Sequence, residues 1–248
     1  MVFRRTHEEI AVMRRAGRVV AEMHTVCRDA IRPGVTTSHL DRLARDVLDR
    51  RGATSNFLGY HGFPAVICAS VNDEVVHGIP GGRTLEEGDI ISIDCGAVIE
   101  GWHGDAAFTM GVGEISEADE ALIETGRRSL DAAIEVMYAG NTIGDIGHAT
   151  ETTAVAGGGA VLRDYTGHGI GRAMHEAPDV PNHGKPGKGR TLKPGMVLAV
   201  EPMVVAGDPD VMELEDGWTV VTCDGGRAVH WEHSIAITED GPEILTLP

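Results

Sequence analysis

The chain has 248 residues, of which 42% are hydrophobic, which is enough for one large domain with a sizeable core. It carries 38 acidic against 21 basic residues, and the resulting net charge of −17 excludes a protein that wraps nucleic acid or rests on an anionic membrane with its whole surface. The sequence contains neither an apolar run near 18 residues nor a secretory signal, so we expect no membrane span. Four scattered cysteines without a CxxC pair exclude a zinc finger and a disulfide framework, and favour the reducing cytoplasm.

Hydrophobic periodicity and helix-capping signals divide the chain into helices and strands. Thr6 and Glu9 have the spacing of a capping box, Pro33-Gly34 ends the helix that follows, and Ser116 has the position of an N-cap. The predicted elements, in order, are helices at 6–30 and 37–51, strands at 65–71 and 74–77, a hairpin at 89–110, helices at 117–138 and 143–156, strands at 197–205 and 218–223, and a last pair at 228–238 and 242–247.

The predicted hairpin carries two aspartates, Asp94 and Asp105. If its axis lies between Ile99 and Glu100, the two carboxylates face each other directly on one side of the sheet. Like charges in that position destabilise a sheet, at about 4 Å by about 4 kcal/mol even with an effective dielectric constant near 20. The hairpin therefore predicts a cation between the two carboxylates.

The order of the elements repeats, and some residues repeat with it. Residues 84–94 align with residues 191–201, with identical threonine, leucine and glycine, and Asp94 falls on Glu201. Residues 33–36 similarly resemble residues 139–142. We therefore predict an α+β fold of two pseudo-symmetric halves, about 1–113 and 114–248, each with two helices and mainly antiparallel strands.

If Glu201 is the counterpart of Asp94, the second half needs a partner for it. Glu232 lies at a strand position, and His168 lies in a glycine-rich segment between the halves. With Asp94 and Asp105 these residues supply four carboxylates and one imidazole. Four negative charges balance two divalent cations, and shared oxygens suit a pair about 3.5–4 Å apart. One nitrogen among many oxygens favours Mn, Fe or Co, with Zn as an alternative.

Six short motifs extend this pattern over essentially the whole chain. They are Val76–Pro80, Ile93–Gly96, Trp102–Asp105, Gly167–Gly171, Glu201–Met203 and Glu232–His233. With these motifs the sequence resembles the type I methionine aminopeptidases, M24 metallopeptidases that have the pita-bread fold. The resemblance implies hydrolytic removal of the initiator methionine from nascent proteins with a small second residue, by a hydroxide that bridges two metal ions.

The resemblance also implies a role for each site residue. Asp105 and Glu232 would bridge both metals, Asp94 would chelate one of them, and His168 and Glu201 would complete the other. Glu201 would also take the proton of the attacking water.

Two histidines outside the ligand set are implied to be catalytic. His77 would assist proton handling at the scissile amide, and His175 would donate to the developing oxyanion. Eight of the nine remaining histidines are expected on the surface or in packing, at positions 7, 24, 39, 103, 148, 183, 230 and 233.

By resemblance, the methionine side chain would occupy an apolar pocket. Its walls would be Phe57, Tyr60, Phe63, Cys68, Met174 and Trp218. Phe57 stands where many bacterial members have cysteine, Phe63 replaces a tyrosine and Met174 a phenylalanine. These differences put the pocket volume and inhibitor fit in doubt, but keep the pocket apolar.

Two other functions are compatible with a pita-bread fold. An X-Pro aminopeptidase or prolidase of the same fold usually carries a large extra N-terminal domain, which 248 residues do not accommodate. A non-catalytic pita-bread binding module is disfavoured by the intact ligand set. The glycine-rich stretches 157–159 and 167–171 lack the pattern of a phosphate-binding loop.

The expected partner is the N-terminal methionine of nascent peptides, with transient ribosome contact. Lys185, Lys188 and Lys193, or the arginine-rich first helices, are the candidate contacts, and the acidic segment 208–216 would oppose docking. We expect a cytoplasmic monomer with no membrane association and no direct nucleic-acid function.

Overall fold

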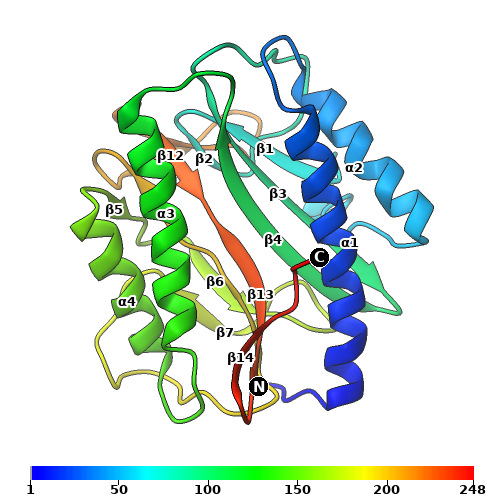
Figure 1. Cartoon of the computed structure of the whole chain (residues 1–248), viewed down its shortest axis with the longest axis vertical. Coiled ribbons are helices and arrows are strands. Elements are labelled where there is room, and N and C mark those ends of the chain that lie inside the picture. The colour runs from blue at the N-terminus through cyan, green and yellow to red at the C-terminus, as the bar shows by residue number, and fades with distance from the viewer. Residues whose placement is uncertain (1) are drawn as a thin grey trace.

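The computed structural model describes residues 2–248, and in it two pairs of helices cover one face of a curved sheet (Figure 1). The helices are α1 (His7–Ala30), α2 (Thr37–Arg51), α3 (Glu117–Glu135) and α4 (Ile143–Ala156). A short 3-10 turn, η1, spans Tyr60–Gly62. The capping box at the start of α1 is confirmed, because Thr6 accepts from the Glu9 amide and Glu9 accepts from that of Thr6. The third helix ends near residue 135 rather than 138, where the Asn141 side chain donates to the Val136 carbonyl.

The central sheet has eight strands among the residues described, in the order β1-β3-β4-β13-β8-β6-β7, and β14 also pairs with β13. Two three-stranded sheets, β10-β11-β2 and β12-β9-β5, flank it. The strands are β1 (Ile67–Val71), β2 (Glu74–Val76), β3 (Ile90–Ile99), β4 (Trp102–Gly111), β5 (Ala160–Val161), β6 (Thr166–Gly169), β7 (Glu176–Pro181), β8 (Val197–Val200), β9 (Met203–Val205), β10 (Val211–Glu213), β11 (Val220–Thr222), β12 (Ala228–His230), β13 (Glu232–Thr238) and β14 (Gly241–Ile244).

Two segments that we predicted as single strands are each divided in two. Residues 197–205 divide into β8 and β9 at Glu201-Pro202, and residues 228–238 divide into β12 and β13 at Trp231. The Trp231 amide donates to the Pro202 carbonyl, so the two breaks lie beside each other. Both chain segments therefore leave the central sheet at the same place.

The register of the β3–β4 hairpin corrects our prediction for its two aspartates. Ile99 pairs with Trp102, so Glu100 and Gly101 form a two-residue loop, and both have positive φ, as such loops favour. Asp94 consequently pairs with Ala107, and Asp105 pairs with Gly96. The carboxylates share one face of the sheet but lie diagonally, so the predicted direct opposition was wrong.

The sheet presents different faces to the helices and to the other side. Alternate residues of β3 and β4, such as Ile93 and Phe108, pack with α1 and α2 in one core cluster. Leu198 and Ile235 pack with Leu130 of α3 in a second cluster. The intervening residues, including both aspartates, point away from the helices. No helix among residues 2–248 is both long and apolar enough to cross a membrane.

Candidate metal centre and active site

A cavity of about 200 Å³ lies on the sheet face that is turned away from the helices. Every side chain that the sequence predicted as a metal ligand, a catalytic group or a pocket wall lines this cavity. They come from positions 57, 60, 63, 68, 77, 94, 105, 168, 174, 175, 201, 218 and 232. The structure thus brings together residues from β3, β4, β6 and β13 and from the segments that follow β2, η1 and β8.

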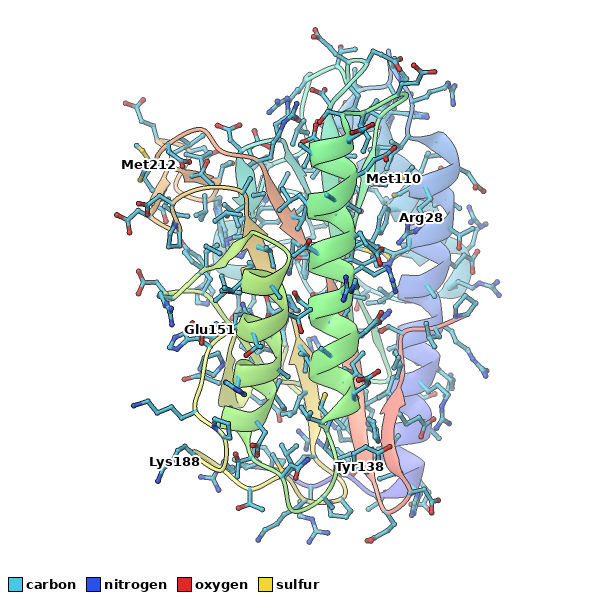
Figure 2. The ribbon with its side chains drawn as sticks, turned by 60° about the vertical axis from the view of Figure 1, so that its left-hand side comes forward. Arg28, Met110, Tyr138, Glu151, Lys188 and Met212 are labelled. Atoms are coloured by element: carbon cyan, nitrogen blue, oxygen red, sulfur yellow. The ribbon has the colours of Figure 1, made fainter. Side chains whose placement is uncertain are left out.

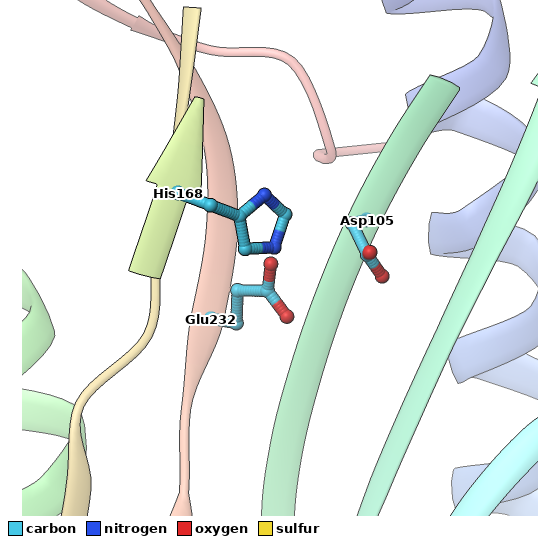
Figure 3. Close-up of side chains that lie close together, drawn as sticks. All are labelled: Asp105, His168 and Glu232. Carbon is cyan, nitrogen blue, oxygen red and sulfur yellow. The ribbon is translucent and has the colours of Figure 1, made fainter. Parts of the chain in front are cut away.

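Three of the predicted ligands form a compact group. Asp105, His168 and Glu232 each offer a ligand atom, and these atoms lie within 4.8 Å of one another (Figure 3). Glu201 adjoins the group, because its Oε1 is 3.4 Å from His168 Nε2. Asp94 lies on the same sheet face as Asp105, on the neighbouring strand, and is half-buried. The arrangement gathers acids from both halves of the chain around one point.

Burial and mutual repulsion dominate the electrostatics of the carboxylates. Burial raises the pKa values of Asp94, Asp105 and Glu232 well above their usual range, and repulsion from neighbouring acids adds to the effect. Burial raises the pKa of Glu201 to about 8. Within residues 2–248, Asp94 Oδ1, Asp105 Oδ1 and Glu232 Oε1 have no hydrogen-bond partner. Because buried acceptors without partners are costly, these oxygens fit ligation of a cation.

His168 has the protonation and orientation that a metal ligand needs. Burial lowers its pKa to about 3, so the imidazole is neutral. Its Nδ1–H donates to the Gly169 carbonyl at 3.0 Å, which leaves the Nε2 lone pair directed at the acids. A Cβ on Gly167 would lie 2.4 Å from the Ala199 carbonyl oxygen, so this glycine permits close pairing of β6 with β8.

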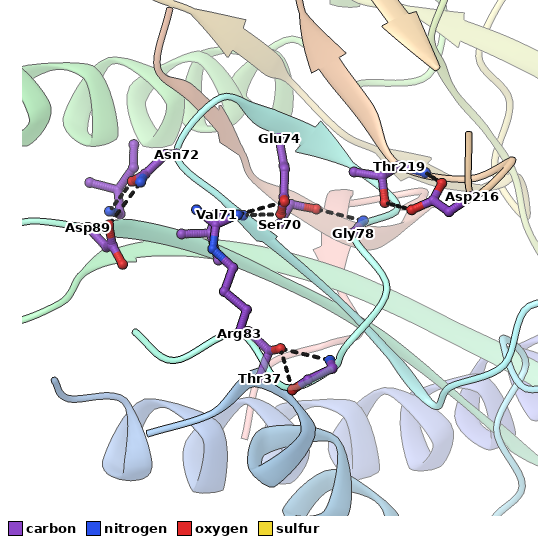
Figure 4. A network of polar contacts seen from close by, with 12 residues as sticks. Thr37, Ser70, Val71, Asn72, Glu74, Gly78, Arg83, Asp89, Asp216 and Thr219 are labelled. Atoms are coloured by element: carbon purple, nitrogen blue, oxygen red, sulfur yellow. Dashed lines mark hydrogen bonds and ion pairs between the residues drawn. The ribbon is translucent and has the colours of Figure 1, made fainter. Parts of the chain in front are cut away.

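His77 lies directly after β2 with a φ of 61°, an unusual conformation for a residue with a side chain. A polar network fixes the chain around it (Figure 4). The Gly78 amide donates to Ser70 Oγ at 3.1 Å, and Glu74 accepts from the Val71 amide at 2.7 Å. Burial lowers the pKa of His77 to about 4, so its ring is neutral at physiological pH.

His175 is positioned by two aromatic neighbours. Its Nδ1 lies 2.8 Å from the Tyr60 hydroxyl, and its ring centroid is 4.2 Å from that of His168. Burial lowers its pKa as well. His77 and His175 are therefore both neutral imidazoles at the cavity wall, each able to donate one N–H.

The remaining wall of the cavity is apolar. Phe57, Phe63, Cys68 and Met174 are buried in one cluster, and the Phe63 and Trp218 ring centroids are 5.0 Å apart. Burial raises the pKa of the Cys68 thiol well above its usual value, so this cysteine is a wall residue and a poor nucleophile at neutral pH.

Sequence reasoning missed some cavity residues, of which His230 is the most informative. It was expected on the surface or in packing, but it is buried and lines the cavity, as do Val76, Tyr165, Thr166 and Met203. Strand alternation from Glu232 is the signal that could have found it, since residues two apart share a face.

Comparisons with known proteins agree with this geometry. The model of metallopeptidase family M24 matches residues 11–239. Methionine aminopeptidase 1 of Mycobacterium tuberculosis is 51% identical, with 100% of this chain and 96% of that protein covered. Methionine aminopeptidase of Clostridium perfringens is 49% identical, with coverages of 100% and 99%. The crystal structure of methionine aminopeptidase from Thermotoga maritima superposes with a TM-score of 0.99 at 44% identity, covering 100% of both chains. This superposition confirms the expected pita-bread fold.

Proposed function

The chain belongs to metallopeptidase family M24 and to its methionine aminopeptidases, and from this premise we propose that the acidic cavity is the active site. The reaction is hydrolytic removal of the initiator methionine from nascent proteins, and we propose that it requires a small second residue. One observation carries the assignment of the site: a single cavity combines a buried acidic cluster with apolar walls.

The enzyme uses divalent metal, and we propose that it holds two ions. Asp105 and Glu232 would bridge them, Asp94 would complete the coordination of one ion, and His168 and Glu201 that of the other. The unpartnered oxygens of the cluster support this assignment within the described chain. One nitrogen among many oxygens favours Mn, Fe or Co over Zn. Two bound metal ions would activate water near neutral pH and would polarise the scissile carbonyl.

The protein side chains handle the proton and the developing charge. Glu201 takes a proton from the attacking water and delivers it to the leaving amine. His77 assists at the scissile amide. When the Tyr60 hydroxyl donates to His175 Nδ1, the proton of that imidazole stays on Nε2, where it can donate to the oxyanion.

Selectivity follows from the apolar part of the cavity. A thioether offers dispersion and weak sulfur–aromatic contacts, which Phe57, Phe63 and Trp218 can supply. Met174 adds a flexible wall. Because these side chains are apolar, charged N-terminal residues would lose hydration without compensation and would be rejected.

Steady-state cleavage of Met-Ala-Ser and Ala-Pro-Ala tests the function. Metal-stripped protein receives Mn, Fe, Co or Zn, and we expect metal-dependent release of methionine from the first peptide alone. Turnover of the proline peptide instead would favour an X-Pro aminopeptidase. Metal binding without turnover of either peptide would favour a binding module.

We further propose transient ribosome contact through the loop that joins β7 and β8. Lys185, Lys188 and Lys193 are exposed there, and they are all the lysines of a chain with a net charge of −17. Figure 2 places Lys188 well away from Met212, which lies in the acidic segment 208–216. Ribosome co-sedimentation that is unchanged after replacing the three lysines by glutamine would exclude this loop in favour of the arginine-rich helices.

We propose a monomer, because one chain supplies every proposed ligand. We propose a cytoplasmic location, supported by a substrate made at ribosomes and by the four cysteines, which are free thiols in the described chain.

A further inference from the structure

His230 ends β12 inside the cavity and is only 2% exposed. Its Nε2 lies 3.4 Å from Glu201 Oε2, and His168 Nε2 lies 3.4 Å from Oε1 of the same carboxylate. The contact with Glu201 is longer than an ordinary hydrogen bond, and His230 Nε2 has no closer polar partner in residues 2–248. Glu201 is thus placed between two imidazoles, of which only His168 is a proposed ligand.

The backbone of His230 is held firmly at this place. Its amide donates to Thr109 Oγ1 at 2.9 Å, and the Thr109 hydroxyl lies 2.9 Å from its carbonyl oxygen. His230 also pairs with Met203, two residues after Glu201, in the β12–β9 ladder. The fold therefore sets His230 beside Glu201 through main-chain contacts from two sides.

Only one of the two imidazoles can donate a hydrogen bond to Glu201. His168 donates its Nδ1–H to a carbonyl, so its Nε2 carries a lone pair and cannot donate to Glu201. A neutral imidazole has a single N–H, and the contact of His230 Nε2 with Glu201 Oε2 favours its placement on that nitrogen. Glu201 Oε2, 3.4 Å from His230 Nε2, is an acceptor for that N–H, and a buried donor without a partner would be costly.

We propose that His230 is a positioning residue that donates Nε2–H to Glu201 Oε2 and so directs Oε1 toward the metal that His168 also binds. The inference rests on the proposed function, because it assigns a second contact to a proposed ligand and proton carrier. Partners of this kind orient metal-binding side chains, and their loss typically lowers metal affinity or activity by about 10–100-fold.

A matched pair of variants tests the hydrogen bond. Glutamine and methionine have similar size and shape, but only glutamine carries an N–H donor at its tip. We expect His230→Met to weaken Mn²⁺ binding to metal-stripped protein, measured by calorimetry, and to lower kcat for Met-Ala-Ser, each by about 10–100-fold. KM should change less than about threefold, and His230→Gln should recover most of both losses.

His233→Met is the control, because His233 lies on the opposite strand face and contacts Thr246. We expect it to lower the thermal unfolding midpoint and to leave Mn²⁺ affinity within about threefold of wild type. A folded His230→Met variant with wild-type affinity and kcat would overturn the proposal. Equal losses in the glutamine and methionine variants would also overturn it, since they would indicate a packing role.

A measurement on the unmodified side chain covers the case in which His230→Met does not fold. Long-range ¹H–¹⁵N spectra of the Zn²⁺-loaded protein report which ring nitrogen of each histidine is protonated. We expect the Nε2–H tautomer for His230, assigned by its absence in His230→Gln. An Nδ1–H tautomer, or an Nε2 signal typical of metal coordination, would contradict the proposal. Failure of the proposed function is distinct, because wild-type protein would then not cleave Met-Ala-Ser with any metal.

Discussion

Asp105 illustrates, at the scale of a single residue, how the fold prepares a ligand. Its backbone amide lies 3.0 Å from Ser234 Oγ, and the Ser234 hydroxyl donates to its carbonyl at 2.8 Å. Ser234 lies two residues after Glu232, so one hydroxyl joins the strands that carry both proposed bridging acids. The amide and the carbonyl of Asp105 are thus both hydrogen-bonded, whereas its Oδ1 has no hydrogen-bond partner in the described structure.

The cost of this arrangement predicts the behaviour of Asp105→Asn. The amide removes one charge from a buried acidic cluster, so metal-free Asp105→Asn should unfold at a higher temperature than metal-free wild type at pH 8. It should lose most activity and most of the thermal stabilisation that Mn²⁺ gives wild type. Differential scanning calorimetry with and without Mn²⁺ measures both effects.

Glu213→Gln is the matched control, since Glu213 is an exposed acid of β10. We expect it to follow wild type with and without metal. If Mn²⁺ stabilised Asp105→Asn as much as wild type, Asp105 would not be a ligand.

Residue types and spacing were sufficient to predict that the four acids and His168 meet, because an acid matched to an acid in a repeated segment is a specific signal. The two catalytic histidines and the pocket walls followed only from the family resemblance. His230 could not be assigned in this way. Alternation from Glu232 could place it on the cavity side, but a buried histidine looks alike in sequence whether it fills a core or contacts a carboxylate. The distance to Glu201 is set by the pairing of β9 with β12, which no local pattern reveals.

At the scale of elements, the long helices, the bounds of the hairpin and several short strands were predicted well, whereas β5, β6, β7 and β10 were not. Capping residues and apolar periodicity define α1, α2 and α4 locally. By contrast, β5 and β6 are short and adjoin or contain glycine, so they have little strand signal of their own. The hairpin register was misjudged because its axis was placed between Ile99 and Glu100, one residue before its true position between Glu100 and Gly101.

The packing of α1 on β4 predicts how stability depends on pH. His24 of α1 is buried, its Nε2 lies 3.0 Å from the Ala106 carbonyl oxygen, and its ring packs edge-on against Phe108. Burial lowers its pKa from 6.5 to about 3. Between these values the unfolded chain binds a proton that the folded chain does not, so acid destabilises the fold.

We therefore expect His24→Gln to unfold less steeply with acid than wild type. The variant should be less stable at pH 7, because its packing is altered. As the pH decreases, the free energy of unfolding of the variant should fall less than that of wild type. The difference should grow by up to about 1.4 kcal/mol per pH unit and should total about 2 kcal/mol by pH 5. Urea unfolding at several pH values measures this pH dependence. His148→Gln is the control, because His148 is an exposed histidine of α4. Parallel curves for His24→Gln and wild type would contradict a buried neutral His24.

At the scale of the whole molecule, the two halves make equivalent contacts. Isolated bridges join Thr36 to Thr84 in the first half and Thr142 to Thr191 in the second, at matching places in the sequence repeat. These bridges support our proposal of a single catalytic domain with halves at about 1–113 and 114–248. The first half supplies Asp94 and Asp105, and the second supplies the other proposed ligands. Neither half alone would hold the complete site, which explains why its acids lie so far apart in sequence.

The most direct test of the paired-metal site is electron paramagnetic resonance of metal-stripped protein loaded stepwise with Mn²⁺. We expect two ions per chain and, at the second equivalent, the exchange-coupled spectrum of ions about 3.5–4 Å apart. Cleavage of Met-Ala-Ser should be followed on the same samples. Two equivalents that gave only the spectrum of isolated ions, or full cleavage without added metal, would contradict the account.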